Sequence, residues 1–110
     1  MDKIDFDTFK KVEMKVGQIV EINRVDGADK LYKLQVDLGE EQPRQIVTGL
    51  VPFYNEEELL NKKVVVVSNL KPAKFRGEES NGMILAAGSE EGGFSILTLD
   101  REAPIGSIVS

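Results

Sequence analysis

The chain has 110 residues, of which 41 % are hydrophobic and 30 % charged, and its formal net charge is -5 at pH 7. It contains no cysteine and no histidine, which excludes disulfides, thiolate and serine–histidine catalysis, and metal sites built from those two residues. No apolar run approaches the roughly 18 residues of a membrane span, and the opening MDKIDFDTFKK lacks the apolar region of a signal peptide. We therefore expect one cytoplasmic domain, residues 1–110, large enough to bury its own core.

The chain opens with a short helical turn followed by a strand. Asp5 or Asp7 is placed to cap the turn, which would present Phe6 and Phe9, three residues apart, to the body of the protein. Residues 13–24 then show the period-two pattern of a strand. The side chains expected to point inward from this strand are Met14, Val16, Val20 and Ile22.

A turn and a strongly alternating strand come next. Gly17, inside the first strand, marks a bulge or a bend. Residues 25–29 supply turn formers, and within residues 31–38 (LYKLQVDL) apolar and polar side chains alternate from Tyr32 onward. This alternation predicts a half-buried strand. Its inward face holds Tyr32, Leu34, Val36 and Leu38.

The second half of the chain contains more short strands and one helical turn. Residues 42–50 form the third expected strand, and VVVVSNL, residues 64–70, reads as a strand covered on both faces. Between them Asn55 precedes three glutamates and two leucines, which is the pattern of a capping box rather than of a metal site. GMILAAG and FSILTL complete at least six strands.

This order of elements is typical of an OB-fold, an all-β, five-stranded Greek-key barrel with a helical turn between its third and fourth strands. A β-sandwich gives a similar spacing of strands. The barrel core is expected over about residues 9–88. Residues 89–110 form a C-terminal extension with extra strands, which would cover a sheet edge or pair with a second copy.

The cations are concentrated in one stretch of the sequence. Residues 62–76 contain five cations and no acid, a local charge of +5. Because the whole chain has a net charge of -5, the remaining residues together carry -10. Such a cluster either docks a polyanion or is an ordinary solvated loop. Pro72 argues for an extended loop after the fourth strand. That loop would hold Lys71, Lys74 and Arg76 outward.

Several segments resemble the tRNA-binding domain family, which occurs free-standing or attached to aminoacyl-tRNA synthetases, notably methionyl-tRNA synthetase and its beta chain. The most distinctive segment is VSNLKPAKFRGEESNGMILAA, supported by MKVGQIVEI, ADKLYKLQVDLGEE and PRQIVTGL in the family's order over roughly residues 9–88. The resemblance implies an OB-fold, tRNA as ligand, a homodimer in many free-standing members, no cofactor, and no catalysis by the domain itself.

The resemblance and the expected barrel together give the candidate tRNA-binding residues. The family's Ser-x-Gly-Met element carries over to Ser80 and Met83, while Asn81 stands where glutamine is commoner and Phe75 where leucine is commoner. Phe75 would either stack on a base or anchor the loop in the core. In many relatives histidine and proline precede the Ala-Asp-Lys element, where this chain has residues 25–27. The complete candidate set is Lys30, Lys33, Arg44, Asn69, Lys71, Lys74, Arg76, Ser80, Asn81 and Met83.

The function expected from the resemblance is that of a non-catalytic tRNA-binding module, which raises the local tRNA concentration for a synthetase partner such as methionyl-tRNA synthetase. The alternative is a chaperone-like protein on the same barrel that binds peptides in its groove, as some relatives of the family do. Charge reversal at Lys71, Lys74 and Arg76 separates the two, because an apolar peptide contact does not depend on these cations.

Overall fold

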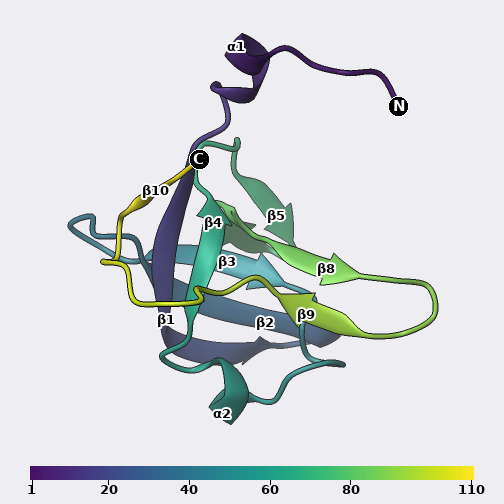
Figure 1. Cartoon of the computed structure of the whole chain (residues 1–110). Helices are drawn as coiled ribbons and strands as arrows, with labels where there is room; N and C mark the ends of the chain where they lie inside the picture. The colour runs from purple at the N-terminus through teal and green to yellow at the C-terminus, as the bar shows by residue number, and fades with distance from the viewer.

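The computed structural model describes the whole chain, residues 1–110, and its regular structure consists of strands and two short helical turns (Figure 1). The two helices, α1 (Phe6–Phe9) and α2 (Glu56–Leu59), are four-residue turns, and neither is long and apolar enough to cross a membrane. The strands are β1 (Met14–Val25), β2 (Ala28–Asp37), β3 (Arg44–Thr48), β4 (Lys63–Val67), β5 (Ala73–Phe75), β6 (Glu78–Ser80), β7 (Met83–Ile84), β8 (Ala86–Gly88), β9 (Phe94–Ile96) and β10 (Ile108–Val109).

The main sheet has the strand order β3-β2-β1-β4-β7, and each neighbouring pair is antiparallel. Its first three strands form a meander, and β4 returns to pair with β1, which is the connectivity of an OB-fold. The predicted all-β, OB-like fold class is therefore confirmed. In the C-terminal extension, β9 pairs with β8, and β10 pairs with Met14 and Lys15 at the start of β1.

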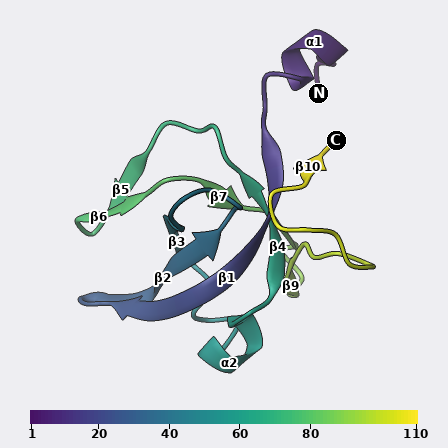
Figure 2. The same cartoon turned by 90° about the vertical axis from the view of Figure 1, so that its left-hand side faces the viewer.

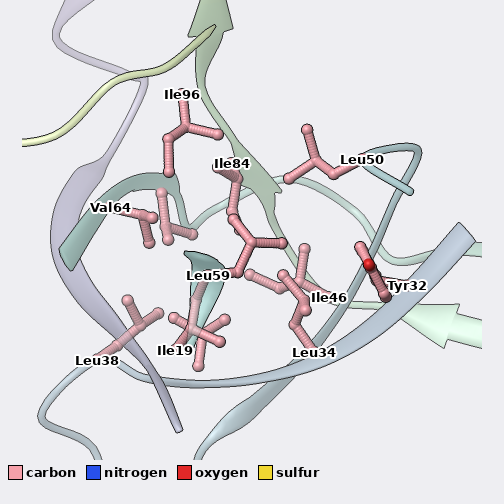
Figure 3. Close-up of a cluster of buried hydrophobic side chains, with 12 residues drawn as sticks. Ile19, Tyr32, Leu34, Leu38, Ile46, Leu50, Leu59, Val64, Ile84 and Ile96 are labelled. Carbon is pink, nitrogen blue, oxygen red and sulfur yellow. The ribbon is translucent and has the colours of Figure 1, made fainter. Parts of the chain in front are cut away.

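The core lies between the curled strands and α2. On β2 the residues Tyr32, Leu34 and Val36 are buried, and the side chains between them are half-buried, as the alternation predicts. All four valines of β4 are buried, which confirms a strand covered on both faces. Leu59 of α2 joins the same cluster (Figure 3). Each fully buried leucine, isoleucine or valine contributes about 1.5–3 kcal/mol to stability.

In β1 the bulge lies at a different place from the one predicted. Ile19 pairs with Val36 and Glu21 with Gln35, so Val20 is the extra residue of the bulged strand. Val20 is exposed rather than inward-facing, and Ile19 takes the core position instead. Gly17 has another role: a Cβ there would lie 2.7 Å from Val36 Cγ1, so the glycine permits close packing of β1 on β2.

The two helical turns begin at the predicted caps. The Asp5 carboxylate accepts a hydrogen bond of 2.8 Å from the Thr8 amide, and Asn55 and Glu58 form a capping box at the start of α2. The prediction that α1 packs its phenylalanines against the rest of the protein is wrong. Phe6 is 70 % exposed, and α1 has no buried residue, because the N-terminal arm, residues 1–12, stands away from the sheet (Figure 1).

The last residue of β6 and the residue after it are joined to β3, which fixes the root of the hairpin formed by β5 and β6. The Asn81 amide donates to the Gln45 carbonyl over 2.8 Å, and the Val47 amide donates to the Ser80 hydroxyl over 3.0 Å. Gly82 follows with φ +136°, and a Cβ there would lie 3.3 Å from Ile46 Cδ1 and Val66 Cγ1. Both the backbone conformation and the close approach therefore favour glycine at this position.

Candidate nucleic-acid interface

The most prominent surface feature is a β-hairpin that stands out from the main sheet (Figure 2). Strands β5 and β6 pair only with each other, with Lys74 opposite Glu79 and Phe75 opposite Glu78. Arg76 and Gly77 form the two-residue turn, and both have positive φ, +52° and +81°. Positive φ at both central residues is the geometry that suits the right-handed twist of a hairpin. The predicted extended loop after β4 is confined to residues 68–72, and residues 73–80 form a hairpin instead.

Three cations of this hairpin have no acidic partner. Lys71 lies just before β5, Lys74 within it and Arg76 in the turn; all three are exposed, and their side chains make no ion pair or hydrogen bond. We call residues 71–80 the basic hairpin. Because these charges remain free in solvent, they are able to neutralise phosphates without first breaking a contact within the protein.

The start of β2, next to the β1–β2 turn, brings a fourth cation beside the turn of the basic hairpin. Lys30 and Arg76 line one surface hollow of about 290 Å³, together with residues 27–29 and Leu31. Lys30 is exposed and has no ion pair. The loop between the first two strands is one of the two loops with which OB-folds bind oligonucleotides. Two candidates 46 positions apart in the sequence thus meet at one place.

The other cations of residues 62–76 lie apart from the basic hairpin. Lys62 and Lys63 are at the start of β4, whereas the hairpin follows the end of that strand. Lys63 Nζ donates to a Glu102 carboxylate oxygen over 2.8 Å and to the Ala103 carbonyl over 2.7 Å. The local charge of +5 seen in the sequence is therefore not a single patch in the structure.

Lys33 and Arg44 are bound to acids. Lys33 Nζ lies 3.4 Å from the nearer carboxylate oxygen of Glu78. The Arg44 guanidinium makes a bidentate contact with Glu40, at 2.9 and 2.8 Å, and also donates to the Ser68 carbonyl. The Arg44 side chain is only 18 % exposed. Neither cation is as free to receive a phosphate as the three on the basic hairpin.

These contacts shift several pKa values. The hydrogen bond from Arg44 lowers the pKa of Glu40, and the same contact raises the pKa of Arg44. The pKa of Glu13 is lowered by a hydrogen bond from the Ser68 hydroxyl and by the charge of Lys15. All three groups therefore stay charged near neutral pH, and they form a fixed set of opposite charges beside the start of β3.

Asn69 and Ser80 use their side chains within the protein. The Asn69 amide group accepts a hydrogen bond from the Glu13 amide over 2.8 Å and donates to the Lys11 carbonyl over 2.6 Å, which ties the end of the N-terminal arm to the segment after β4. The Ser80 hydroxyl is buried; besides accepting from Val47 it donates to the Gly82 carbonyl over 3.2 Å.

Asn81, Met83 and Phe75 are more accessible. The Asn81 side chain makes no hydrogen bond within the protein and lines a polar hollow of about 730 Å³. Met83 is 47 % exposed on β7, and Phe75 is 44 % exposed on β5. Phe75 is thus not anchored in the core, and Met83 is not a core methionine.

The polar hollow contains residues that the sequence did not indicate. Its lining holds three glutamates and two glutamines but no hydrophobic side chain: Glu40, Glu41, Gln42, Pro43, Arg44, Gln45, Glu79 and Asn81. Gln45 also donates to the Glu79 carbonyl over 2.9 Å, so it lies at the contact between β3 and the basic hairpin. The sequence predicts a strand over residues 42–50, but it has no signal that the hairpin covers Gln45.

The comparisons with known proteins agree with this geometry. Residues 14–108 match the family model of the tRNA binding domain. Methionine–tRNA ligase of Methanococcus maripaludis is 51 % identical over 107 residues, which are 97 % of this chain and 16 % of that protein. A MetRS related protein from Pyrococcus horikoshii has a TM-score of 0.92 and 41 % identity, with 100 % of both chains covered. The chaperone CsaA of Picrophilus torridus has a TM-score of 0.88 and 27 % identity, covering 98 % of this chain and 100 % of its own.

These findings confirm the resemblance stated from the sequence. The matched region runs from the start of β1 into β10, and so includes the basic hairpin, the β1–β2 turn and the polar hollow. The chain spans 16 % of the length of the ligase that it matches, whereas it covers the whole of the Pyrococcus protein. The chain belongs to the tRNA-binding domain family.

Proposed function

We propose that this domain binds tRNA with the basic hairpin and the adjacent β1–β2 turn. The observation that carries the proposal is the set of free cations at one place: Lys71, Lys74 and Arg76 have no acidic partner, and Lys30 shares a hollow with Arg76. Free cations on a protruding element suit a phosphate chain because each one neutralises a phosphate and releases counterions.

The residues of the interface would have different tasks. Lysine acts as a point charge on phosphate, whereas Arg76 is able to grip one bidentately or to stack on a base. Phe75 is exposed beside these cations, and stacking of an unpaired base on it would be worth about 1–3 kcal/mol. Asn81 and Met83 are open to nucleotide contacts next to the hairpin. We assign Lys33, Arg44, Asn69 and Ser80 the task of shaping this surface, since their polar groups are held within the protein.

The acidic remainder of the chain restricts where RNA is able to bind. Screening confines the attraction of each cation to about 10 Å at moderate ionic strength, so the free cations act locally although the chain has a net charge of -5. Glu40, Glu41 and Glu79 repel phosphates from the polar hollow. Hydrogen-bond donors of RNA, such as 2′-hydroxyls and base amino groups, would suit this hollow better.

In the cell we propose that the domain concentrates tRNA for a methionyl-tRNA synthetase in the cytoplasm. The support is that a methionine–tRNA ligase contains a segment 51 % identical to almost all of this chain. Joining a weak tRNA site to a synthetase makes the second binding event intramolecular, which raises the overall affinity. The domain needs no chemistry of its own for this effect.

We further propose that residues 1–110 act as one binding unit, with a core at about residues 9–88, and that two copies associate around a twofold axis. Support for the dimer comes from apolar side chains left in solvent at one end of the molecule: Ile4, Phe6 and Phe9 on the N-terminal arm, and Ile108 on β10. The arm and the C terminus lie together at this end in both views (Figures 1 and 2).

Charge reversal tests the assignment of the interface. The variant Lys71→Glu, Lys74→Glu, Arg76→Glu should weaken tRNA binding by about 100-fold or more, because it removes three phosphate contacts and adds repulsion. The control is Lys62→Glu with Arg101→Glu, which reverses two cations outside both the hairpin and the N-terminal arm. Filter binding or fluorescence anisotropy at fixed salt would measure both affinities. Equal losses in the two variants would contradict the proposal.

The same variants distinguish a second candidate function. The similarity to the chaperone CsaA favours a domain that binds unfolded peptides. Such binding relies on apolar contacts, so the hairpin variant should keep it. If the wild-type domain holds an unfolded polypeptide but no tRNA, the chaperone-like function replaces the one proposed.

A further inference from the structure

A glutamate lies among the free cations of the basic hairpin, where it should weaken the binding of a polyanion. Glu78 directly follows the Arg76–Gly77 turn and faces β2 and β3. One of its carboxylate oxygens lies 3.4 Å from Lys33 Nζ of β2, and the other lies 3.4 Å from Gln45 Nε2 of β3. Glu79, its neighbour in sequence, has a free carboxylate; only its carbonyl accepts a hydrogen bond from Gln45.

The contacts of Glu78 continue into the main sheet. Gln45 Oε1 accepts a hydrogen bond of 3.2 Å from Gln35 Nε2 of β2. Lys33, Gln35 and Gln45 are half-buried on the outer faces of β2 and β3, so these strands present a row of fixed polar groups to the hairpin. The side-chain contacts of Glu78 thus reach both strands of the sheet beneath the hairpin.

The hairpin needs such support because its own pairing is limited. Strands β5 and β6 have three residue pairs and belong to no larger sheet, and an isolated two-stranded hairpin is marginally stable in water. Its root is fixed to β3 through Ser80 and Asn81 at the end opposite the turn, and Gln45 Nε2 holds the Glu79 carbonyl in between. Among the residues near the turn, Glu78 makes the side-chain contacts with the sheet.

We infer that Glu78, Lys33 and Gln45 form a clamp that fixes the basic hairpin in the orientation that RNA binds. The clamp rests on the proposed function for its purpose, and its members are positioning residues rather than phosphate contacts. Lys71, Lys74 and Arg76 are then already in their binding positions before the RNA arrives. Binding therefore does not have to order these side chains, which lowers its entropic cost. One acidic charge near the RNA is the cost of this arrangement.

The substitution Glu78→Met distinguishes the clamp from simple electrostatics by the sign of its effect. It removes a negative charge beside the phosphates while keeping the length of the side chain, so electrostatics alone predicts tighter binding of tRNA. Loss of the clamp predicts weaker binding, by about 3- to 10-fold. Glu79→Met is the matched control, because it removes the same charge from the next residue, whose carboxylate makes no hydrogen bond or ion pair with the sheet; its affinity should stay the same or rise. Binding of Glu78→Met at least as tight as that of Glu79→Met would overturn the inference.

Lys33→Met tests whether this lysine positions the hairpin or touches phosphate. The logarithm of affinity falls linearly with the logarithm of salt concentration, and each phosphate contact contributes about 0.7–0.9 to the slope. A positioning lysine leaves the slope unchanged while affinity falls, whereas a phosphate contact reduces the slope by that amount. The double variant Lys33→Glu, Glu78→Lys swaps the two charges and should bind tRNA more tightly than either single variant. If it does not, and if Lys33→Met also has a reduced salt slope, the clamp is overturned.

Hydrogen exchange of the hairpin amides, residues 73–80, provides a readout without RNA. Glu78→Met should speed this exchange, and Glu79→Met should leave it unchanged. If the wild-type domain fails to bind tRNA while Glu78→Met still speeds exchange, the proposed function falls and the clamp stands. If tRNA binds but the two variants exchange alike, the clamp falls and the proposed function stands. The unfolding midpoints of the two variants, compared beside the exchange data, show whether faster exchange is local to the hairpin.

Discussion

At the scale of single residues, Arg44 joins the turn before β3 to the segment after β4. It begins β3, its guanidinium holds both carboxylate oxygens of Glu40 in the preceding turn, and it donates to the carbonyl of Ser68 after β4. A bidentate arginine–carboxylate pair fixes direction as well as distance. Because the side chain is mostly buried, the pair is screened less than an ordinary surface pair.

Replacing Glu40 with glutamine should therefore destabilise the protein in a pH-dependent way. Arg44 lowers the pKa of Glu40 below its ordinary value of 4.5, so the contribution of the pair is complete above that value and is lost as the pH falls through the lower, folded-state pKa. We expect Glu40→Gln to lower the free energy of unfolding by about 1 kcal/mol at pH 7. Urea unfolding at pH 7 and at about pH 2 measures the change, which should largely vanish at the acidic pH.

Glu41→Gln is the control, since Glu41 is exposed, lies next in sequence and makes no ion pair. It should leave stability unchanged at both pH values. A loss for Glu40→Gln that is as large in acid as at neutrality would show that the ion pair is not its source.

At the scale of elements, the contact of β1 with β2 depends on a missing side chain. A Cβ at Gly17 would lie 2.7 Å from Val36 Cγ1 and 2.8 Å from Leu38 Cδ2, and both side chains belong to the packed core. Gly17→Ala should therefore lower the free energy of unfolding by about 1–3 kcal/mol through overpacking. Thermal unfolding would record this as a fall in midpoint of about 4–8 °C per kcal/mol.

Gly49→Ala makes the same chemical change where a Cβ would meet nothing within 4 Å. By restricting the unfolded chain it should be neutral or slightly stabilising, by about 0.4–1 kcal/mol. If both alanines destabilise the protein to the same extent, backbone flexibility rather than the β1–β2 contact is responsible.

The strands with strong local patterns were predictable, and those that depend on distant partners were not. The alternation of residues 31–38, the valines of β4 and the capping box at Asn55 each encode their structure within a few residues. The bulge at Val20 is set by register against β2, which no local pattern reveals. The basic hairpin was missed because Arg76 and Gly77 differ from the Asn-Gly or Asp-Gly pairs that usually signal such a turn.

The candidate site was predictable to a similar extent. Charge and motif identified Lys71, Lys74 and Arg76, which the structure leaves exposed and unpaired. The same reasoning grouped Lys33 and Arg44 with them, although Glu78 and Glu40 hold those two cations. The pairing of Glu78 with Lys33 follows from the position of β6 against the main sheet. The pairing of Glu40 with Arg44 follows from the turn before β3. Composition gives only the number of charges, and not their pairing.

At the scale of the whole molecule, the end that holds the N-terminal arm exposes several large apolar side chains to solvent. The N-terminal arm carries Ile4, Phe6 and Phe9 in solvent, and no residue of α1 is buried. The arm is not loosely attached, because Asn69 holds the backbone on both sides of Val12. An arm that is held at its base and exposes several large apolar side chains is typical of a surface that is buried against a partner. In the proposed twofold dimer, that surface belongs to a second copy.

The dimer predicts a specific dependence of mass on the arm. Sedimentation of the wild-type chain should show a species of about twice the 12.2 kDa monomer, and Phe6→Ser with Phe9→Ser should shift the equilibrium to monomer because apolar area is lost from each arm. Val20→Ser with Leu60→Ser is the matched control: both are exposed apolar residues, but they line a hollow between β1 and α2, away from the arm. A wild-type chain that sediments only at 12.2 kDa at high concentration contradicts the dimer. If the control pair dissociates the dimer and the arm variant does not, the twofold contact lies at α2, and the arm has another partner.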